Sequence, residues 1–321
     1  MAVMQFAIVK CHGSGNDFPL IDARALTLDD GDWAMVARAL ADRDGPVGGD
    51  GLLLLTAGDD AHPFGMRMFN ADGSEAETCL NGLRCVARAG FEALGLDRAA
   101  ALLKTSDAAV VRDADVAAGV YTVRETAGPA SLAIAAWPMA IGAETLVEAP
   151  IAPLPTGRAF TAVAMPNPHL VAFVDAVDEA ELVRVGEACE AAPDWLPNRA
   201  NVSFVEVRPR PDGGTDLFVR TFERGVGLTD SCGSAMAAST YAACLTGRIA
   251  FDQATTVFNQ GGLVRGEARA DGMVSLSGNA TFEWAGSVAV DLDTGAAGAL
   301  TVERRFDDEI AAWDALIAAI G

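Results

Sequence analysis

The stretch FNADGSEAETCLNGLRC, residues 69–85, places a cysteine at a change in sequence character. Before Cys79 the residues are polar and turn-prone, and after the stretch the apolar residues of VARAGFEAL, residues 86–94, recur at helical spacing. Cys79 is therefore predicted to lie at a helix N-terminus, with the helix continuing through residues 92–103. Backbone N–H groups and the positive end of the helix dipole favour a thiolate there and form a seat for a carboxylate.

A second stretch, FERGVGLTDSCGSA at residues 222–235, has the same layout. Phe69 precedes Cys79 by ten positions and Phe222 precedes Cys232 by ten, each in an Arg-x-Phe triplet. The chain is thus predicted to be internally duplicated, with two helix N-termini, each carrying a thiol, directed at a shared cleft. A single cysteine among glycine and alanine is more often a core residue, but the matched spacing favours a functional pair.

The composition bounds the class of protein. A chain of 321 residues that is 51% hydrophobic and 21% charged is long enough for two well-packed domains. The formal charge of −21 argues against nucleic-acid partners and against anionic membrane surfaces. The N-terminal residues lack a signal-peptide pattern, and no apolar run approaches the ~20 residues that a spanning helix needs. We expect a cytoplasmic protein with free thiols.

The sequence lacks the usual signatures of a metal or cofactor site. Its six cysteines form no C-x-x-C pair, and its three histidines are too scattered for a zinc site. It contains no G-x-G-x-x-G motif after a strand, no P-loop and no G-x-S-x-G motif. With neither metal nor cofactor expected, the two cysteines would have to perform proton chemistry unaided.

Short strand patterns alternate with a few helical ones, which is typical of an α+β protein with two similar lobes. Residues 28–41 and 306–320 have helical periodicity, and strand patterns surround each cysteine stretch. The proline-rich segment 143–155 is the predicted crossing between the halves.

These motifs together resemble the cofactor-independent diaminopimelate epimerases. The resemblance rests on the following segments: residues 12–18 (HGSGNDF), 69–75, 81–85, 167–169 (NPH), 199–201 (RAN), 223–225 and 232–234. It implies two pseudo-symmetric lobes, each a mixed, mostly antiparallel sheet around a central helix. The lobes would comprise residues 1–140 plus 283–321 and residues 141–282, with an active site between them that takes an amino-acid substrate, in a homodimer.

The resemblance also implies the chemistry, which is the conversion of LL-diaminopimelate to meso-diaminopimelate in lysine biosynthesis. Cys79 and Cys232 would be the catalytic acid and base on opposite faces of the α-carbon, with thiol pKa values lowered by the helix ends. His169 and Glu223 would tune their coupled protonation. The implied substrate-binding residues are Asn16, Asn70, Leu80, Asn81, Asn167, Asn201, Glu223, Arg224, Gly233 and Ser234, with Arg224 for the distal carboxylate and Glu223 for the distal ammonium.

Three positions depart from the family pattern. Leu80 and Ala235 stand where the family has glycine, and Gly51 stands where it usually has a substrate-contacting glutamine. Two alternatives therefore stay open, namely an epimerase or racemase of another amino acid on this fold and a catalytically silent amino-acid-binding protein. Loop asparagines are often turn formers, and His169 could be a satisfied buried imidazole.

Overall fold

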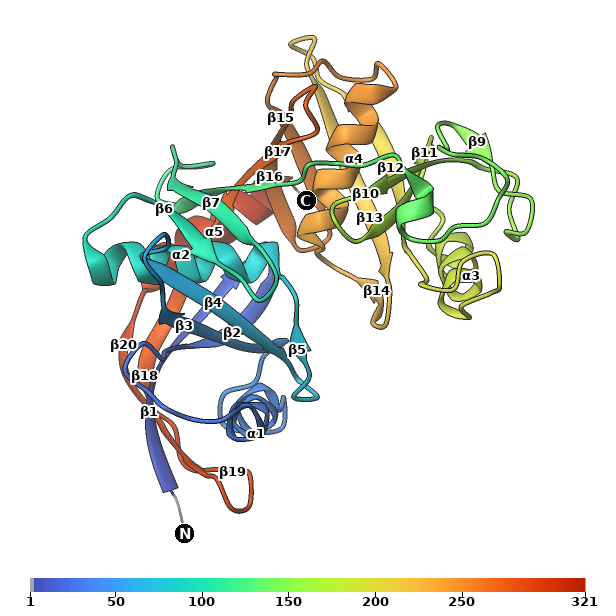
Figure 1. Cartoon of the computed structure of the whole chain (residues 1–321). Coiled ribbons are helices and arrows are strands. Elements are labelled where there is room, and N and C mark those ends of the chain that lie inside the picture. Colours follow the sequence, from blue (N-terminus) through green and yellow to red (C-terminus); the bar gives the residue numbers. More distant parts are fainter. Residues whose placement is uncertain (1–2, 321) are drawn as a thin grey trace. The chain divides into compact units, whose positions relative to one another are not determined.

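The computed structural model describes residues 3–320, and the chain divides into two compact units (Figure 1). Unit 1 comprises Met1–Glu125 and Ser277–Gly321, and unit 2 comprises Thr126–Leu276. The chain leaves unit 1 within strand β8 (Thr122–Ala127) and returns to it within β17 (Val274–Asn279). The proline-rich segment 143–155 lies inside unit 2.

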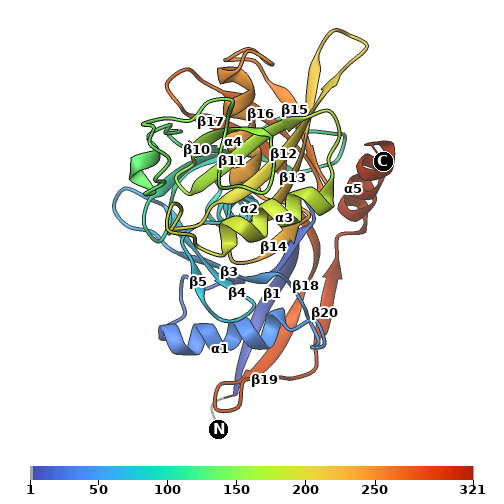
Figure 2. The same ribbon diagram turned by 90° about the vertical axis from the view of Figure 1, so that its right-hand side faces the viewer.

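Unit 1 begins with the strands and helices that carry the first cysteine. Its elements are β1 (Val3–Gly13), β2 (Asn16–Asp22), α1 (Asp30–Ala41), β3 (Gly51–Ala57), β4 (Phe64–Asn70), β5 (Glu75–Ala76), α2 (Leu80–Leu94), β6 (Arg98–Leu102), β7 (Asp107–Arg112) and β8 (Thr122–Ala127). The returning chain adds β18 (Thr281–Asp291), β19 (Ala296–Ala297), β20 (Thr301–Arg305) and α5 (Asp307–Ile320). Strand β18 pairs with both β1 and β20, and the three run side by side in Figure 2.

Unit 2 carries the second cysteine. Its elements are the short helix η1 (Ile134–Ala136), β9 (Ala149–Pro150), β10 (Ala159–Ala164), β11 (Pro168–Val174), α3 (Glu179–Glu190), β12 (Asn201–Pro209), β13 (Thr215–Glu223), β14 (Gly227–Thr229), α4 (Gly233–Leu245), β15 (Thr255–Asn259), β16 (Gly262–Ala268) and β17 (Val274–Asn279). The α+β class with a central helix in each unit, expected from the sequence, is confirmed.

The two units repeat one order of strand pairing. In unit 1, β1–β2 is antiparallel, β2–β3 parallel, β3–β4 antiparallel, β4–β6 parallel and β6–β7 antiparallel. In unit 2, β10–β11, β11–β12, β12–β13, β13–β15 and β15–β16 follow with the same orientations in the same order. Helices α1 and α3 occupy equivalent places in this order, and so do α2 and α4. The topology therefore bears out the predicted internal duplication.

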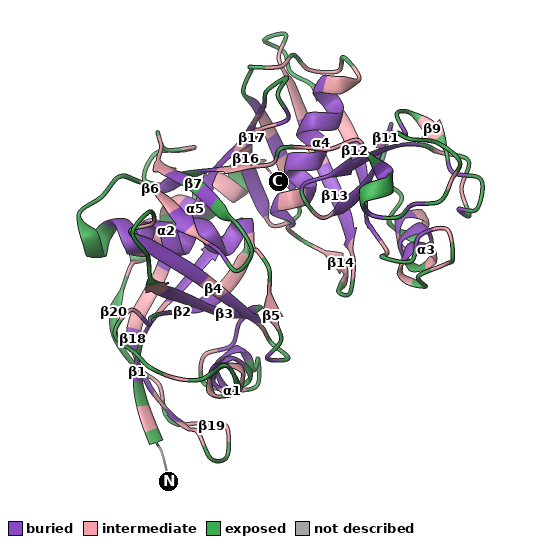
Figure 3. Cartoon of the chain, viewed as in Figure 1, coloured by how far each residue is buried: buried purple, intermediate pink, exposed green. Residues whose placement is uncertain are grey.

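The central helix of each unit is buried along most of its length. Every residue of α2 from Leu80 to Arg88 is buried, and so are the residues of α4 from Ala235 to Cys244 (Figure 3). Helix α4 contains no charged residue between its first and last positions, and a helix that is apolar all round belongs inside a sheet layer. Helix α2 instead buries two arginines.

The predicted continuation of α2 through residues 92–103 is wrong beyond Leu94. The helix ends at Leu94, because Gly95 adopts a left-handed conformation with φ of 68° and its N–H donates to Phe91 O. This is a common way to stop a helix, since glycine enters that region without steric cost. Residues Arg98–Leu102 then form β6.

Candidate functional site

In unit 1, Cys79 is the N-cap residue of α2, as the sequence predicts. Its Sγ accepts a hydrogen bond from the Gly82 N–H at 3.4 Å and lies 3.8 Å from Asn16 Oδ1. The cysteine thus caps the helix with sulfur where serine or aspartate is more usual. Asn16 opens β2, so the β1–β2 turn brings a second predicted site residue to the thiol.

The Asn16 side chain is itself held by a residue that the sequence reasoning missed. Its Nδ2 donates to Asp50 Oδ2 at 2.5 Å, and the same carboxylate accepts the Asp17 N–H at 3.1 Å. Arg43 Nη2 donates to the other oxygen of Asp50 at 2.6 Å. Asp50 lies in the turn sequence GGDG at residues 48–51. This sequence predicts only a loop, because nothing in it indicates the distant partner Asn16.

The other predicted site residues of unit 1 lie on α2 and β4. Leu80 and Asn81 form the start of the helix and are 8% and 2% exposed. The Asn81 side-chain Oδ1 accepts from Arg84 Nη2 at 2.8 Å. Asn70 ends β4, and its Nδ2 donates to Ser74 Oγ at 2.9 Å within the turn that leads to β5. Asn70 therefore makes a turn-forming contact, which is the structural role that loop asparagines often have.

In unit 2, Cys232 is the N-cap residue of α4, again as predicted. A chain of side-chain contacts leads away from it. Cys232 Sγ lies 3.6 Å from Ser234 Oγ, Asn167 Nδ2 donates to Ser234 Oγ at 3.1 Å, and Asn167 Oδ1 lies 3.1 Å from His169 Nε2. Asn201 Nδ2 lies 3.4 Å from the same ring nitrogen. Unit 2 thus links five predicted site residues in one network.

Glu223 and Arg224 lie at the end of β13 and complete this half. Thr229 Oγ1 donates to Glu223 Oε1 at 2.5 Å. The Arg224 backbone N–H donates to Asn201 Oδ1 at 2.8 Å, and its Nη1 donates to Asn198 O at 3.0 Å. The β12–β13 pair therefore presents a carboxylate and a guanidinium beside the network that contains Cys232.

A family comparison fits these features. The diaminopimelate epimerase family model matches residues 8–129 and 161–283, which include both cysteine stretches. The diaminopimelate epimerase of Clostridium acetobutylicum is 39% identical over 297 residues, covering 90% of this chain and 87% of that protein. The Listeria monocytogenes diaminopimelate epimerase is 36% identical over 307 residues, covering 92% of this chain and 91% of that protein.

The chain belongs to the diaminopimelate epimerase family. This confirms the resemblance read from its motifs and makes the protein an isomerase with diaminopimelate epimerase activity.

Solved structures share the diaminopimelate epimerase-like fold at low sequence identity. A protein described as a predicted epimerase from Pseudomonas aeruginosa matches with a TM-score of 0.63 and 18% identity, over 87% of this chain and 98% of that chain. A hydroxyproline epimerase from Agrobacterium vitis matches with a TM-score of 0.58 and 15% identity, over 91% of this chain and 93% of that chain. These likenesses show the fold alone.

The electrostatics of this diaminopimelate epimerase correct one expectation. The pKa of the Cys232 thiol is raised well above its ordinary value, because the sulfur is desolvated by burial and faces the Glu223 carboxylate. Ser234 and the Ala235 N–H act in the opposite direction but less strongly. The helix end therefore does not lower this pKa as predicted, since burial and a like-signed neighbour outweigh it.

His169 is fully buried and neutral at physiological pH. Its pKa is lowered to about 3, chiefly by desolvation and secondarily by the Arg224 charge. Its Nε2 faces the two asparagines, whereas its buried Nδ1 has no hydrogen-bond partner among the described residues. It is thus a buried imidazole that is only partly satisfied. The neutral ring contacts the Asn167 amide that donates to Ser234, and it adds no charge beside Cys232.

Two further observations concern what the chain could bind. Within residues 3–320, no cluster of three or more His, Cys, Asp or Glu side chains could hold a metal ion. In the same residues no helix has both the length and the apolar character to cross a membrane. Unit 1 and unit 2 each offer a thiol, a helix N-terminus and amide side chains, and these groups suit proton transfer beside a carboxylate.

Proposed function

We propose that Cys79 and Cys232 invert the α-carbon of LL-diaminopimelate to give meso-diaminopimelate. One cysteine, as thiolate, removes the α-proton from one face, and the electron pair of the broken C–H bond delocalises onto the α-carboxylate. The other cysteine, as thiol, returns a proton to the opposite face and becomes the thiolate. One thiolate and one thiol remain at the end, so the pair is ready for the reverse turnover.

The observation that carries this proposal is the matched pair of N-cap cysteines on two topologically equivalent helices. A helix leaves its first N–H groups without intrahelical acceptors, and the negative charge that grows on the α-carboxylate is stabilised there. We assign this role to the N–H groups of Leu80 and Asn81 on α2, and of Gly233 and Ser234 on α4.

Cys232 is assigned the resting thiol. Burial and Glu223 disfavour its thiolate, so it would donate the proton when the substrate is the isomer deprotonated by Cys79. His169, neutral and linked to Ser234 through Asn167, and Glu223 would tune this protonation as the pair titrates together.

The remaining predicted residues are assigned to the rest of the substrate. Arg224 would bind the distal carboxylate, because a guanidinium has five donors and only Nη1 is engaged with Asn198 O in the contacts described above. Glu223 would accept the distal ammonium through its carboxylate, the opposite charge to that group. Amide side chains would orient the amino and carboxyl groups of the substrate, namely those of Asn16, Asn70, Asn167 and Asn201.

We further assign the enzyme to the cytoplasm and to a homodimer, as the family pattern implies. All six cysteines are free, and a thiol acid–base pair persists only in a reducing compartment. Size-exclusion chromatography with light scattering tests the dimer, and a monomer at assay concentration would contradict it.

Deuterium incorporation from heavy water tests the proposed chemistry. The protein should exchange the α-hydrogen of LL-diaminopimelate and form the meso isomer, while Cys79→Ala and Cys232→Ala should each lose about 10³-fold or more in kcat. Cys85→Ala and Cys244→Ala are matched controls, since these buried cysteines lie on the same two helices. Absence of exchange by the reduced wild-type protein would reject the assignment, and a silent binding protein would give that result.

A second candidate keeps the chemistry and changes the amino acid. A Cβ at Gly51 would lie 2.3 Å from the Phe69 carbonyl oxygen, so this site has no room for the glutamine that the family usually carries. Kinetics over a panel of amino acids would decide, because an enzyme built for diaminopimelate rejects a monocarboxylate that leaves Arg224 unpaired. Higher kcat/KM on a monocarboxylate than on LL-diaminopimelate would favour this second candidate.

A further inference from the structure

A buried arginine on α2 connects the segments that surround Cys79. Arg84 is completely buried in the second turn of the helix. Its guanidinium makes four contacts: Nη1 donates to Glu125 Oε1 at 2.7 Å, Nε to Asn279 O at 3.1 Å, and Nη2 to both Ser14 Oγ at 3.1 Å and Asn81 Oδ1 at 2.8 Å. All four partners belong to unit 1.

These partners come from four separate segments. Ser14 lies in the β1–β2 turn that leads to Asn16, and Asn81 lies in the first turn of α2 directly after Cys79 and Leu80. Glu125 lies on β8, and Asn279 ends β17. Arg84 therefore donates both to the turn that carries Asn16 and to the first helical turn.

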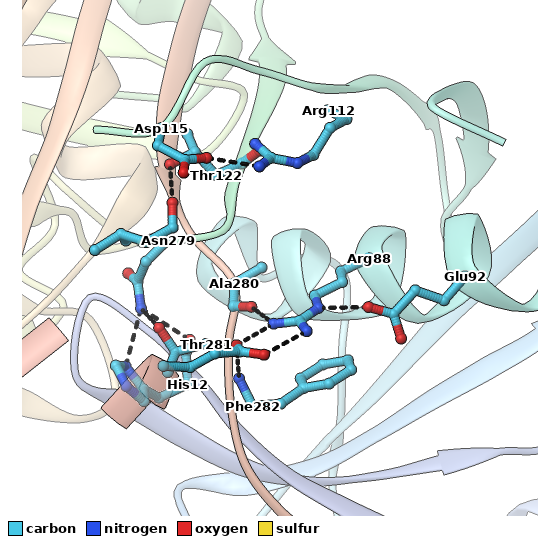
Figure 4. A network of polar contacts seen from close by, with 12 residues as sticks. His12, Arg88, Glu92, Arg112, Asp115, Thr122, Asn279, Ala280, Thr281 and Phe282 are labelled. Atoms are coloured by element: carbon cyan, nitrogen blue, oxygen red, sulfur yellow. Dashed lines mark hydrogen bonds and ion pairs between the residues drawn. The ribbon is translucent and has the colours of Figure 1, made fainter. Parts of the chain in front are cut away.

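Asn279 extends the same connection to β1. Its Oδ1 accepts the Ser14 N–H at 2.7 Å, and its Nδ2 contacts His12 O at 3.2 Å and Thr281 Oγ1 at 2.9 Å. Figure 4 shows this amide pointing toward His12 and Thr281. The β1–β2 turn is thus held from two directions, by the Asn279 amide and by the Arg84 guanidinium.

The turn also fits closely against the start of α2. A Cβ at Gly13 would lie 2.5 Å from Asn81 O and 3.0 Å from Arg84 Nη2. Backbone at that distance leaves no room for a side chain, so a shift of Arg84 would be transmitted to both the turn and the helix start. The geometry around Cys79 is therefore coupled to one buried guanidinium.

Stability alone does not account for this ion pair. Arg84 and Glu125 are both 0% exposed, and a buried pair often contributes less than apolar residues of the same volume. Moreover, Glu125 Oε2 is buried without a hydrogen-bond partner among the described residues. In the equivalent helix α4, Ala237 follows Cys232 by the same number of residues as Arg84 follows Cys79, and this helix packs without any charged side chain.

We propose that Arg84, paired with Glu125, is a positioning residue that fixes the first turn of α2 against the β1–β2 turn. It thereby holds Cys79, the N–H groups of Leu80 and Asn81, and Asn16 in the one geometry that meets the substrate carboxylate. The inference rests on the proposed function of Cys79. Arg84 acts through these groups and does not itself touch the substrate.

Arg88 supplies a matched control on the same helix. It is one turn further along and buried, its Nη1 donates to Ala280 O at 2.9 Å, and its Nη2 donates to Glu309 Oε1 at 2.8 Å. Its guanidinium also lies over the Phe282 ring, 3.8 Å from the centroid (Figure 4). Arg88 thus anchors α2 to Ala280, the residue that follows the Arg84 partner Asn279. The partners of Arg88 lie away from the first helical turn.

The test compares Arg84→Lys and Arg84→Met with Arg88→Lys and Arg88→Met. Rates on LL-diaminopimelate are normalised to folded protein measured by circular dichroism. Arg84→Lys should lower kcat about 10-fold and Arg84→Met about 100-fold, with KM within about threefold, because misplaced groups lose transition-state stabilisation. The Arg88 variants should lower the melting temperature while kcat per folded molecule stays within about twofold of wild type.

Equal kcat per folded molecule in the Arg84 and Arg88 series would overturn the inference. If the Arg84 variants do not fold, Ser14→Ala removes a single Arg84 acceptor and should lower kcat at least about threefold. An unchanged kcat in Ser14→Ala would then be the contrary result. Exchange by the wild-type protein is measured in parallel. An inactive wild type would mean that the proposed function fails. An active wild type whose kcat does not respond to these substitutions would mean that only this inference fails.

Discussion

The two cysteine-capped helices share a backbone plan and differ in the charge around it. Helices α2 and α4 occupy the same place in the same order of strand pairing, and each begins after a cysteine N-cap. On α2 itself the buried charged residues are Arg84 and Arg88, with Glu125 buried against Arg84, whereas Cys232 at the start of α4 faces the carboxylate of Glu223. The duplicated fold thus sets where each thiol lies, and the side chains around each helix set the electrostatic environment of that thiol.

Alkylation should reveal this asymmetry with the largest effect. Cys79 is half-buried, whereas Cys232 is 8% exposed with a raised thiol pKa. The thiolate is the reactive form, so iodoacetamide at pH 8 should label Cys79 roughly 100-fold faster than Cys232. Peptide mass spectrometry over a time course measures both rates, and equal rates would contradict the asymmetry.

The variant Glu223→Gln serves as the companion control. It removes the carboxylate that raises the pKa of Cys232, so labelling of Cys232 should accelerate about 10-fold while Cys79 changes by less than about twofold. The four other cysteines are buried and provide internal references for partial unfolding.

The pH dependence of stability should have opposite signs in the two units. In unit 2, burial lowers the pKa of His169 to about 3, so between pH 6.5 and 3 only the unfolded chain takes up this proton. His169 therefore contributes stability above pH 6.5 that is lost as pH falls, by up to about 1.4 kcal/mol per pH unit. Urea unfolding of wild type and His169→Gln from pH 4 to 7 should give a difference that shrinks toward acid.

In unit 1 the sign reverses at Glu125. Burial raises its carboxyl pKa from 4.5 to about 7, so the folded chain holds a proton that the unfolded chain has lost between these values. Its contribution is present below pH 4.5 and is lost as pH rises through about 7. The unfolding free energy of wild type relative to Glu125→Gln should therefore decline from pH 4.5 to 7, and a rise over that window would contradict the assignment.

The features that the sequence predicted correctly are local, and those that it missed depend on distant partners. The cysteine caps and the duplication follow from turn residues, helical spacing and the matched ten-residue interval, all within short windows. The end of α2 was missed because Gly95, a stop signal, stands inside a continuing apolar pattern. The Asp50–Asn16 contact and the Arg84–Glu125 pair join residues far apart in the chain, and no periodicity encodes them.

The pKa of Cys232 shows the same limit. Its position at a helix end could be predicted from sequence, and a lowered pKa was expected from that position alone. The raised value depends on how deeply the strands of unit 2 bury the sulfur and on the approach of Glu223 from β13. Burial is a property of the assembled sheet, so the sign of the shift was not accessible from the motif.

The smallest expected effect comes from making the two helix starts alike. The first helical residue is Leu80 after Cys79 but Gly233 after Cys232, and Leu80 is one of the departures from the family pattern. Leu80→Gly keeps the backbone N–H assigned to the carboxylate, so kcat on LL-diaminopimelate should change by less than about threefold. The lost burial of the leucine side chain should lower the free energy of unfolding by about 2 kcal/mol.

Steady-state kinetics and urea unfolding of Leu80→Gly measure both quantities, with Leu83→Ala as a control for a buried leucine of α2 outside the first two helical positions. A change in kcat/KM of about 10-fold or more for Leu80→Gly alone would mean that this side chain, and not only its N–H, shapes substrate choice. Such a result would favour the second candidate function, because the departure at Leu80 would then act on specificity where the duplicated backbone by itself does not.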